Sequence, residues 1–306
     1  MTFFIFEMNI YKIDKNHLSA FKGCVIGGAI GDACGHAYEG QDMAIEDISI
    51  LHSPWCISDD TQLTLATYES IITHKNISPE HIASTFVRWF NLKKISGVGS
   101  ATLKALQELQ IGGHWALVGR KGEYAAGNGA AMRIAPLSFF LDPLKFNDRL
   151  LIRDVCRITH HNEEAYAGAM AIILAINFFL TQKKKDAVDF LNYVIKGLPD
   201  SNTRDRLGTM VNEPKKEIAE VASTYGVSAY VCESVPFAIF AASKIFTCDF
   251  KSILEQIISC GGDTDTNSAM AGQIIGTYLG GEKIPYVLSE KLATTNFPQL
   301  FDGLID

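Results

Sequence analysis

Two short stretches place several oxygen-bearing side chains together at the start of an expected helix. The downstream stretch carries Asp263, Asp265 and Thr266 directly after two glycines. A single aspartate at a helix N-terminus is an ordinary cap, because its side chain accepts hydrogen bonds from free backbone N–H groups. Only one of the two carboxylates can occupy the cap position, and the two repel each other. The pair therefore indicates a cation between them.

The upstream stretch repeats this arrangement with Ser58, Asp59 and Asp60, again where a loop leads into a helix. Together the two stretches offer six oxygen donors and no His or Cys. Such a set suits Mg²⁺ or Mn²⁺ rather than Zn²⁺. One cluster alone would be a helix cap, but two clusters favour a metal site.

The composition excludes several classes of protein. The chain has 306 residues, of which 47% are hydrophobic, so it can bury a large core. The net charge of −7, with scattered Lys and Arg, indicates no nucleic-acid surface. Seven dispersed cysteines are typical of reduced thiols in a cytoplasmic protein. No linker interrupts the sequence, which predicts a single compact unit, and nothing requires more than a monomer.

Two apolar segments need an interpretation of their own. The N-terminal residues 1–7 lack a basic opening region and a cleavage site, so we do not expect a signal peptide. We predict an N-terminal arm over residues 1–17, followed by one domain over residues 18–306. Residues 165–180 fall short of the roughly 20 residues that span a bilayer. They predict a buried central helix and no membrane contact.

Helical periodicity dominates the chain. Residues 78–80 (Ser-Pro-Glu) are a strong helix start, and apolar residues then follow at helical spacing through residue 90. Glycines are frequent in residues 18–38, where they would allow neighbouring helices to approach closely. Alternating strand patterns are nearly absent. The sequence predicts an all-α fold with long irregular loops at residues 40–57 and 110–127.

Two glycine-containing loops and one histidine pair hold further candidate chemistry. Residues 97–100 precede a helix, and free N–H groups there could bind a phosphate, although most such turns are only turns. Residues 127–129 (Gly-Asn-Gly) could equally be a tight turn. Residues 159–164 could form an interhelix turn with a cap. For either His160 or His161 alone, the residue type favours a solvated or capping role.

The order and spacing of these motifs resemble the ADP-ribosylglycohydrolase family, which includes the dinitrogenase reductase-activating glycohydrolase. The motifs that carry the resemblance are residues 31–39, 58–61, 127–133, 159–160 and 261–267. The similarity extends from about residue 18 to about residue 280. It implies an orthogonal all-α bundle of the ADP-ribosylglycohydrolase type. It also implies a binuclear Mg²⁺ centre, with Mn²⁺ as an alternative, at the base of a cleft for ADP-ribose. The implied activity releases ADP-ribose from a protein or other acceptor.

The resemblance also implies roles for individual residues. The implied metal ligands are Ser58, Asp59 and Asp60 for one ion, Asp263 and Thr266 for the other, and Asp265 for both. The implied substrate contacts are Gly97, Val98, Gly99 and Ser100, then Gly127, Asn128 and Gly129, then His160 on the ribose and Tyr230 on the adenine. Glu39 is the implied catalytic residue, with Asp59 or Asp60 as alternatives.

The chemistry of the bond agrees with this assignment. Cleavage at the anomeric carbon of ADP-ribose passes through an oxocarbenium-like transition state. Two Mg²⁺ ions can bind the ribose hydroxyls and activate water, and Glu39 can transfer the proton. One position departs from the family, because Gly97 stands where the dinitrogenase reductase-activating branch has an aspartate implicated with its arginine acceptor. This disfavours an arginine linkage and favours a serine, other oxygen or nucleobase linkage.

Two other functions use similar residues. A di-metal phosphoesterase could employ the same ligands, but it would yield AMP and ribose phosphate instead of free ADP-ribose. A non-catalytic ADP-ribose-binding module would keep the cleft and lose ligands. All six ligand positions remain chemically competent here, which favours an enzyme.

Overall fold

The computed structural model describes residues 13–40, 47–49, 55–182, 186–213, 215–297 and 299. Residues 1–12 of the predicted N-terminal arm and most of the predicted loop at 40–57 lie outside this part of the chain. The boundary between arm and domain therefore stays a prediction.

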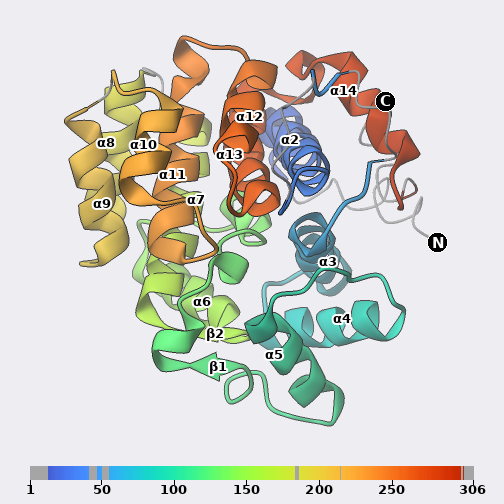
Figure 1. Ribbon diagram of the computed structural model, residues 1–306. Helices are drawn as coiled ribbons and strands as arrows, with labels where there is room; N and C mark the ends of the chain where they lie inside the picture. Colours follow the sequence, from blue (N-terminus) through green and yellow to red (C-terminus); the bar gives the residue numbers. More distant parts are fainter. Residues whose placement is uncertain are drawn as a thin grey trace.

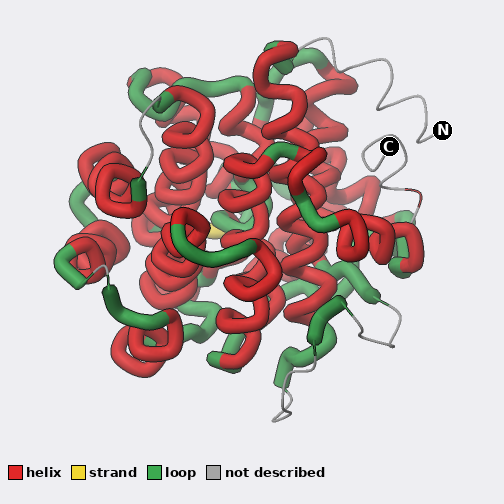
Figure 2. Tube along the Cα trace, turned by 90° about the horizontal axis from the view of Figure 1, so that it is seen from above, coloured by secondary structure: helices red, strands yellow, loops and turns green. Residues whose placement is uncertain are grey.

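Helices make up nearly all of the described secondary structure (Figures 1 and 2). They are α2 (Leu18–His36), α3 (Asp59–His74), α4 (Pro79–Asn91), α5 (Ser100–Gln110), α6 (Phe146–Arg157), α7 (Glu163–Thr181), α8 (Ala187–Gly197), α9 (Asn202–Val211), α10 (Ile218–Tyr225), α11 (Val231–Ser243), α12 (Phe250–Ser259), α13 (Thr264–Leu279) and α14 (Tyr286–Lys291). Short 3₁₀ turns are η2 (Lys15–His17), η3 (Gly122–Ala125), η4 (Asn128–Ala130), η5 (Ala135–Phe139), η6 (Lys244–Phe246), η7 (Gly281–Lys283) and η8 (Leu292–Thr294). The predicted all-α helical bundle is confirmed.

One small departure is a pair of two-residue strands. β1 (Arg120–Lys121) pairs in parallel with β2 (His160–His161). Two residues are too few for an alternating pattern, so these strands could not be predicted from the sequence. The pairing fixes the loop that follows α5 against the turn that precedes α7.

Glycines bring α2 and α13 into direct contact, side by side in Figure 1. A Cβ atom added at Gly27 would lie 2.3 Å from the carbonyl oxygen of Gly272, and one at Gly31 would lie 2.1 Å from that of Ser268. The same closeness recurs one turn further on, between Gly35 and Thr264. The helices run antiparallel, so the end of α2 meets the start of α13. The predicted close approach is confirmed.

Asp32, fully buried on α2, holds the start of α3. Its carboxylate accepts hydrogen bonds from the backbone N–H of Ser58 at 3.0 Å and of Thr61 at 3.1 Å. It also accepts from the Ser58 hydroxyl at 2.8 Å. Because the first N–H groups of a helix have no partner within the helix, this carboxylate supplies one. The beginnings of α3 and α13 therefore both lie against α2.

The other helices match the expectations that concern them. The Ser78 hydroxyl caps α4, and the apolar face of this helix, with Ile82, Phe86 and Trp89, is buried. Helix α7 is long and apolar enough to cross a membrane by composition, yet most of it is buried inside the protein. It packs against α6, α8, α11 and α13. The prediction of a buried central helix is confirmed.

Candidate active site

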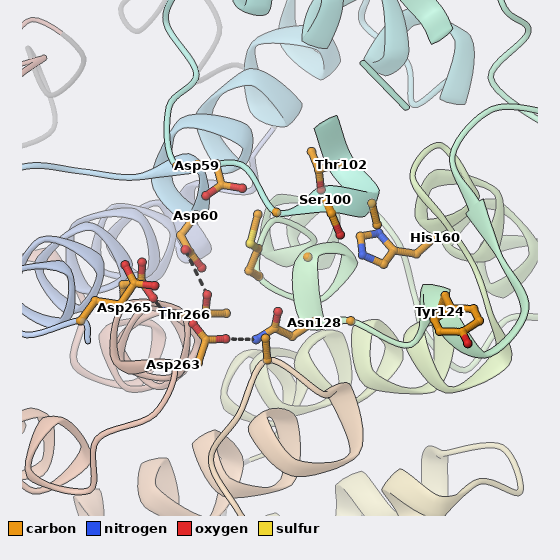
Figure 3. Close-up of a pocket in the computed structure, with 18 residues that line it drawn as sticks. Asp59, Asp60, Ser100, Thr102, Tyr124, Asn128, His160, Asp263, Asp265 and Thr266 are labelled. Carbon is orange, nitrogen blue, oxygen red and sulfur yellow. Dashed lines mark hydrogen bonds between the residues drawn. The ribbon is translucent and has the colours of Figure 1, made fainter. Parts of the chain in front are cut away.

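A pocket opens where the ends of α2, α3, α5 and α13 meet, and its two sides differ in charge (Figure 3). We call one side the acidic wall, which comprises Asp59, Asp60, Asp263, Asp265 and Thr266. We call the opposite side the neutral wall, which comprises Gly97, Gly99, Ser100, Thr102, Tyr124, Gly127, Asn128, Gly129 and His160. Glu39 also lines the pocket.

The two acidic stretches come together on one surface. The Thr266 hydroxyl donates a hydrogen bond to Asp60 Oδ2 at 3.2 Å, although the two residues are 206 positions apart along the chain. Asp32, Asp60 and Asp265 each place a carboxylate oxygen within 4.8 Å of the others. Asp263 occupies the N-cap position of α13, but its side chain makes no capping hydrogen bond. Helix capping therefore does not account for this carboxylate.

Burial opposes ionisation of the acidic wall. Burial and neighbouring carboxylates raise the pKa of Asp59 to about 8 and that of Asp263 to about 7. The same causes raise the pKa of Asp60 well above its ordinary range. Asp265 differs: burial raises its pKa, but the interactions with His36 and Asp263 and the backbone N–H of Thr266 together outweigh burial and lower the pKa. A bound cation would favour the ionised form of every one of these groups.

Ser58 lies behind the acidic wall, and it is not among the residues that line the pocket. Its hydroxyl lies 2.8 Å from Asp32 Oδ1 and 3.0 Å from Asp60 Oδ2, with both oxygens able to accept its proton. Asp32 was quoted in the sequence motif but received no role. It is the only acid within residues 18–38, and a single carboxylate among small and apolar residues was the signal that could have identified it.

Glu39 stands half-exposed at the edge of the acidic wall. Its carboxylate lies 3.6 Å from His36 Nδ1, which is itself 3.7 Å from Asp265 Oδ2. Burial, followed by the charge of Asp265, raises the pKa of Glu39. A carboxylic acid with a raised pKa is a suitable proton donor near neutral pH. His36 was not predicted as a site residue. Its ring lies between the carboxylates of Glu39 and Asp265.

The loop before α5 meets the acidic wall directly. Gly97 adopts the left-handed region, with φ of 83°, and a Cβ atom there would lie 3.5 Å from Asp59 Oδ1. Gly99 occupies the N-cap position of α5 and has no side chain to cap the helix. The free N–H groups of the first turn are therefore available to an anion. Gly97, Gly99 and Ser100 line the pocket as expected, whereas Val98 is not among the lining residues.

The Gly127–Gly129 loop connects the two walls. The Asn128 side-chain amide donates to Asp263 Oδ2 at 2.6 Å. A Cβ atom at Gly129 would lie 2.9 Å from the His160 ring, so only glycine allows the loop to come this close. His160 is 3% exposed and lines the pocket. The expectation of a solvated or capping histidine at this position is wrong, because the ring is buried against Gly127 and Gly129 of the loop.

Both acidic stretches, the N-terminus of α5 and the Gly127–Gly129 loop line one pocket. The acidic stretches and this loop are among the segments whose order along the chain resembles a known family. The sequence model of the ADP-ribosylglycohydrolase family matches residues 14–306. The chain belongs to this family. It is a glycosidase-type hydrolase.

Individual proteins show the same relationship. The ADP-ribosylhydrolase ARH3 of Bos taurus is 26% identical, with 88% of this chain and 87% of the relative covered. The ADP-ribosyl-(dinitrogen reductase) glycohydrolase of Rhodospirillum rubrum is 24% identical, with 90% and 89% covered. A solved ADP-ribosylglycohydrolase-related protein complex superposes with a TM-score of 0.71 at 23% identity, covering 95% of this chain and 97% of that one. At this identity the superposition shows the fold.

The acidic wall of this family member fits a hard divalent cation. Its donors are carboxylate and hydroxyl oxygens, which Mg²⁺ and Mn²⁺ prefer. Asp60 Oδ1 is buried and has no hydrogen-bond partner in the described part of the chain. A buried acceptor left without a partner costs free energy, and a cation would satisfy it.

The aromatic residue at the pocket is not the expected one. Tyr230 was predicted to stack on adenine, but Ala229 lines the pocket and Tyr230 does not. Tyr124 lines it instead and is 83% exposed, at the far end from the acidic wall (Figure 3). The sequence signal that could have identified Tyr124 is its position, three residues before Gly127 and between the two glycine motifs.

Proposed function

We propose that this family member is a Mg²⁺-dependent hydrolase that cleaves the glycosidic bond between ADP-ribose and an acceptor, releasing ADP-ribose. The observation that carries the proposal is the hydrogen bond between Thr266 and Asp60, which joins two distant acidic stretches on one wall of the pocket. The names of the relatives support action on an ADP-ribosylated acceptor.

The proposed metal ligands are the six residues of the two stretches, with two ions shared among them. They are Ser58, Asp59, Asp60, Asp263, Asp265 and Thr266. Bound Mg²⁺ would supply positive charge that holds the ribose hydroxyls and polarises water near the reacting carbon. The chain itself keeps the carboxylates in place through Asp32 on α2 and Asn128 on the opposite side.

The remaining residues bind the nucleotide and move the proton. Free N–H groups at the start of α5 and the Gly127–Gly129 loop would receive the pyrophosphate and the ribose. Tyr124 offers an exposed ring for the adenine. Glu39, which adjoins both the pocket and the acidic wall, is the proposed proton donor to the leaving group and acceptor from water.

For the acceptor, we propose an oxygen-linked or nucleobase-linked ADP-ribose ahead of ADP-ribosylarginine. A guanidinium is recognised best by a dedicated carboxylate that binds it in two places. Gly97 has no side chain, and the nearest carboxylate, Asp59, belongs to the proposed metal ligands.

A panel of ADP-ribosylated substrates tests the proposal. Arginine-, serine-, acidic- and nucleic-acid-linked ADP-ribose would be incubated with the protein in Mg²⁺ and in EDTA, and the products separated by chromatography. We expect free ADP-ribose from at least one non-arginine substrate, in Mg²⁺ only. AMP with ribose phosphate as the product would establish a phosphoesterase instead. Undiminished activity after thorough chelation would contradict the metal-dependent mechanism.

A further inference from the structure

A buried arginine without a carboxylate partner lies next to the neutral wall. Arg133 is completely buried, and it forms no ion pair within the described part of the chain. Its guanidinium lies 5.2 Å from the centre of the Phe86 ring and donates to the backbone oxygen of Gly129. It also donates to Thr159 Oγ1 at 2.9 Å. A buried charge is costly, so this arrangement calls for an explanation beyond packing.

The contacts of Thr159 determine the direction of the next hydrogen bond. Thr159 Oγ1 lies 2.7 Å from His160 Nδ1. A guanidinium can only donate, so the Thr159 oxygen accepts from Arg133. The oxygen has a second lone pair, but if Nδ1–H also donated to it, the buried hydroxyl hydrogen would have no acceptor among the hydrogen bonds of the described residues. The Thr159 hydroxyl therefore donates to His160 Nδ1. A nitrogen that accepts carries no proton, so the ring proton is on Nε2.

The surroundings of His160 keep the ring neutral. Burial, followed by the charges of Arg133 and His161, lowers the pKa of His160 to about 3. His160 is 3% exposed, and Gly127 and Gly129 of the neighbouring loop pack against its ring. Burial and the two neighbouring positive charges all disfavour an imidazolium here.

The Nε2 edge of the ring faces the pocket. Cβ atoms added at Gly127 and Gly129 would each lie 3.3 Å from His160 Nε2. Figure 3 shows the ring at the pocket, beside Ser100 and Thr102 and across from the acidic wall. A bound molecule would therefore meet an N–H group at this position.

We propose that Arg133 and Thr159 are positioning residues that fix His160 in a single neutral tautomer, with its Nε2–H group donating to an oxygen acceptor of the bound ligand. The identity of the ligand as ADP-ribose rests on the proposed function. The acceptor is a ribose or phosphate oxygen, because Nε2–H can only donate. In this tautomer His160 offers the ligand no lone pair, so it does not serve as a general base in hydrolysis.

Nitrogen NMR of the ligand-free protein tests the tautomer without any assay of activity. The full chain would be labelled with ¹⁵N-histidine, and the His160 signals assigned by their loss in His160→Asn. We expect wild type to show Nε2 protonated and Nδ1 unprotonated at neutral pH. A protonated Nδ1, or an even mixture of the two tautomers, would overturn the proposal.

Two substitutions of Thr159 separate positioning from packing. Thr159→Val keeps the shape and removes the hydroxyl, so the two ring nitrogens should move toward an averaged tautomer. Thr159→Ser keeps the hydroxyl and should retain the wild-type nitrogen signals. We expect Thr159→Val to weaken ADP-ribose binding about twofold by calorimetry, because only about half of the protein would then hold the Nε2–H tautomer, with Thr159→Ser near wild type. Wild-type tautomer and affinity in a folded Thr159→Val protein would contradict the role of Thr159.

The outcomes remain distinguishable from those of the proposed function. If ADP-ribose does not bind wild type, the ligand assignment and the proposed function fail together, while the NMR result still decides the tautomer. If ADP-ribose binds but the Nδ1–H tautomer is found, only this inference fails. If Thr159→Val does not fold, the nitrogen signals of wild type and Thr159→Ser still confirm or overturn the fixed tautomer.

Discussion

The acidic wall and the neutral wall face each other across the same pocket, and burial shifts the pKa values of their side chains in opposite directions. On the acidic wall, burial raises the pKa of Asp59 to about 8 and that of Asp263 to about 7, and Asp60 keeps an unpaired oxygen. On the neutral wall, burial lowers the pKa of His160 to about 3, and its polar atoms are hydrogen-bonded or face the pocket. One wall is incomplete without a cation, whereas the other is already arranged for a neutral contact.

The difference indicates that the two walls have separate roles, cation binding on one and ligand binding on the other. In the proposed function a cation offsets the repulsion between the carboxylates, and backbone N–H groups and uncharged side chains of the neutral wall bind the ligand. Substitutions on the acidic wall should therefore abolish turnover, while substitutions on the neutral wall should mainly weaken binding.

Removal of one acid should have the largest effect. We expect Asp59→Ala to lower the rate of ADP-ribose release at least a hundredfold, because a metal ligand is lost, and even outer-shell partners of a metal cost about 10–100-fold. The matched control is Asp189→Ala, which also removes a carboxylate from the first turn of a helix, in α8. The control should retain activity within a factor of about two. A similar loss in both variants would mean that Asp59 acts only on its helix.

The glycine contact that assembles the acidic wall gives the next largest effect. Gly31→Ala places a Cβ atom 2.1 Å from the Ser268 carbonyl oxygen, so α2 and α13 must separate. We expect a loss of about 1–3 kcal/mol in the free energy of unfolding, measured by urea denaturation, with weaker Mg²⁺ binding. Gly208→Ala in α9, which has no atom within 4 Å, is the control and should be neutral or stabilising. Equal stability of both variants would refute the close contact.

Tyr124→Ala tests the far end of the neutral wall. Loss of a stacking platform costs about 1–3 kcal/mol, so the Kd for ADP-ribose should rise by roughly fivefold to a hundredfold in calorimetry. Mg²⁺ binding should not change, since Tyr124 lies far from the acidic wall. Tyr230→Ala is the matched control, because this tyrosine does not line the pocket. If Tyr230→Ala weakens binding and Tyr124→Ala does not, the original assignment from the resemblance is correct.

A smaller effect should appear in the pH dependence of stability. The folded-state pKa values of Asp59 and Asp263 lie above their ordinary value of 3.8, so the folded chain holds protons that the unfolded chain has released. Metal-free protein should therefore lose stability as the pH rises from about 4 to 8. Mg²⁺ binds the ionised acids and should raise the Tm by a few degrees at pH 8 and by less at pH 6. Calorimetry at both pH values measures this, and a larger rise at pH 6 would contradict the account.

The sequence predicted the acidic wall because the local rules conflicted there. Two acids cannot share one helix cap, and the structure leaves Asp263 without a capping hydrogen bond. The glycines of α2 were also informative, since they had no use within an isolated helix. What could not be predicted depends on contacts between distant segments. Examples are the burial of His160 against the Gly127–Gly129 loop, the hydrogen bonds of Asp32, and the position of Tyr124 instead of Tyr230 at the pocket.

The central claim is that the acidic wall holds divalent cations, and anomalous diffraction from crystals grown in Mn²⁺ tests it most directly. The account predicts anomalous density between the carboxylates of Asp60 and Asp265, with Asp59 and Asp263 directed toward it. Crystals whose Mn²⁺ lies elsewhere, with these four side chains turned to different faces of the molecule, would contradict it.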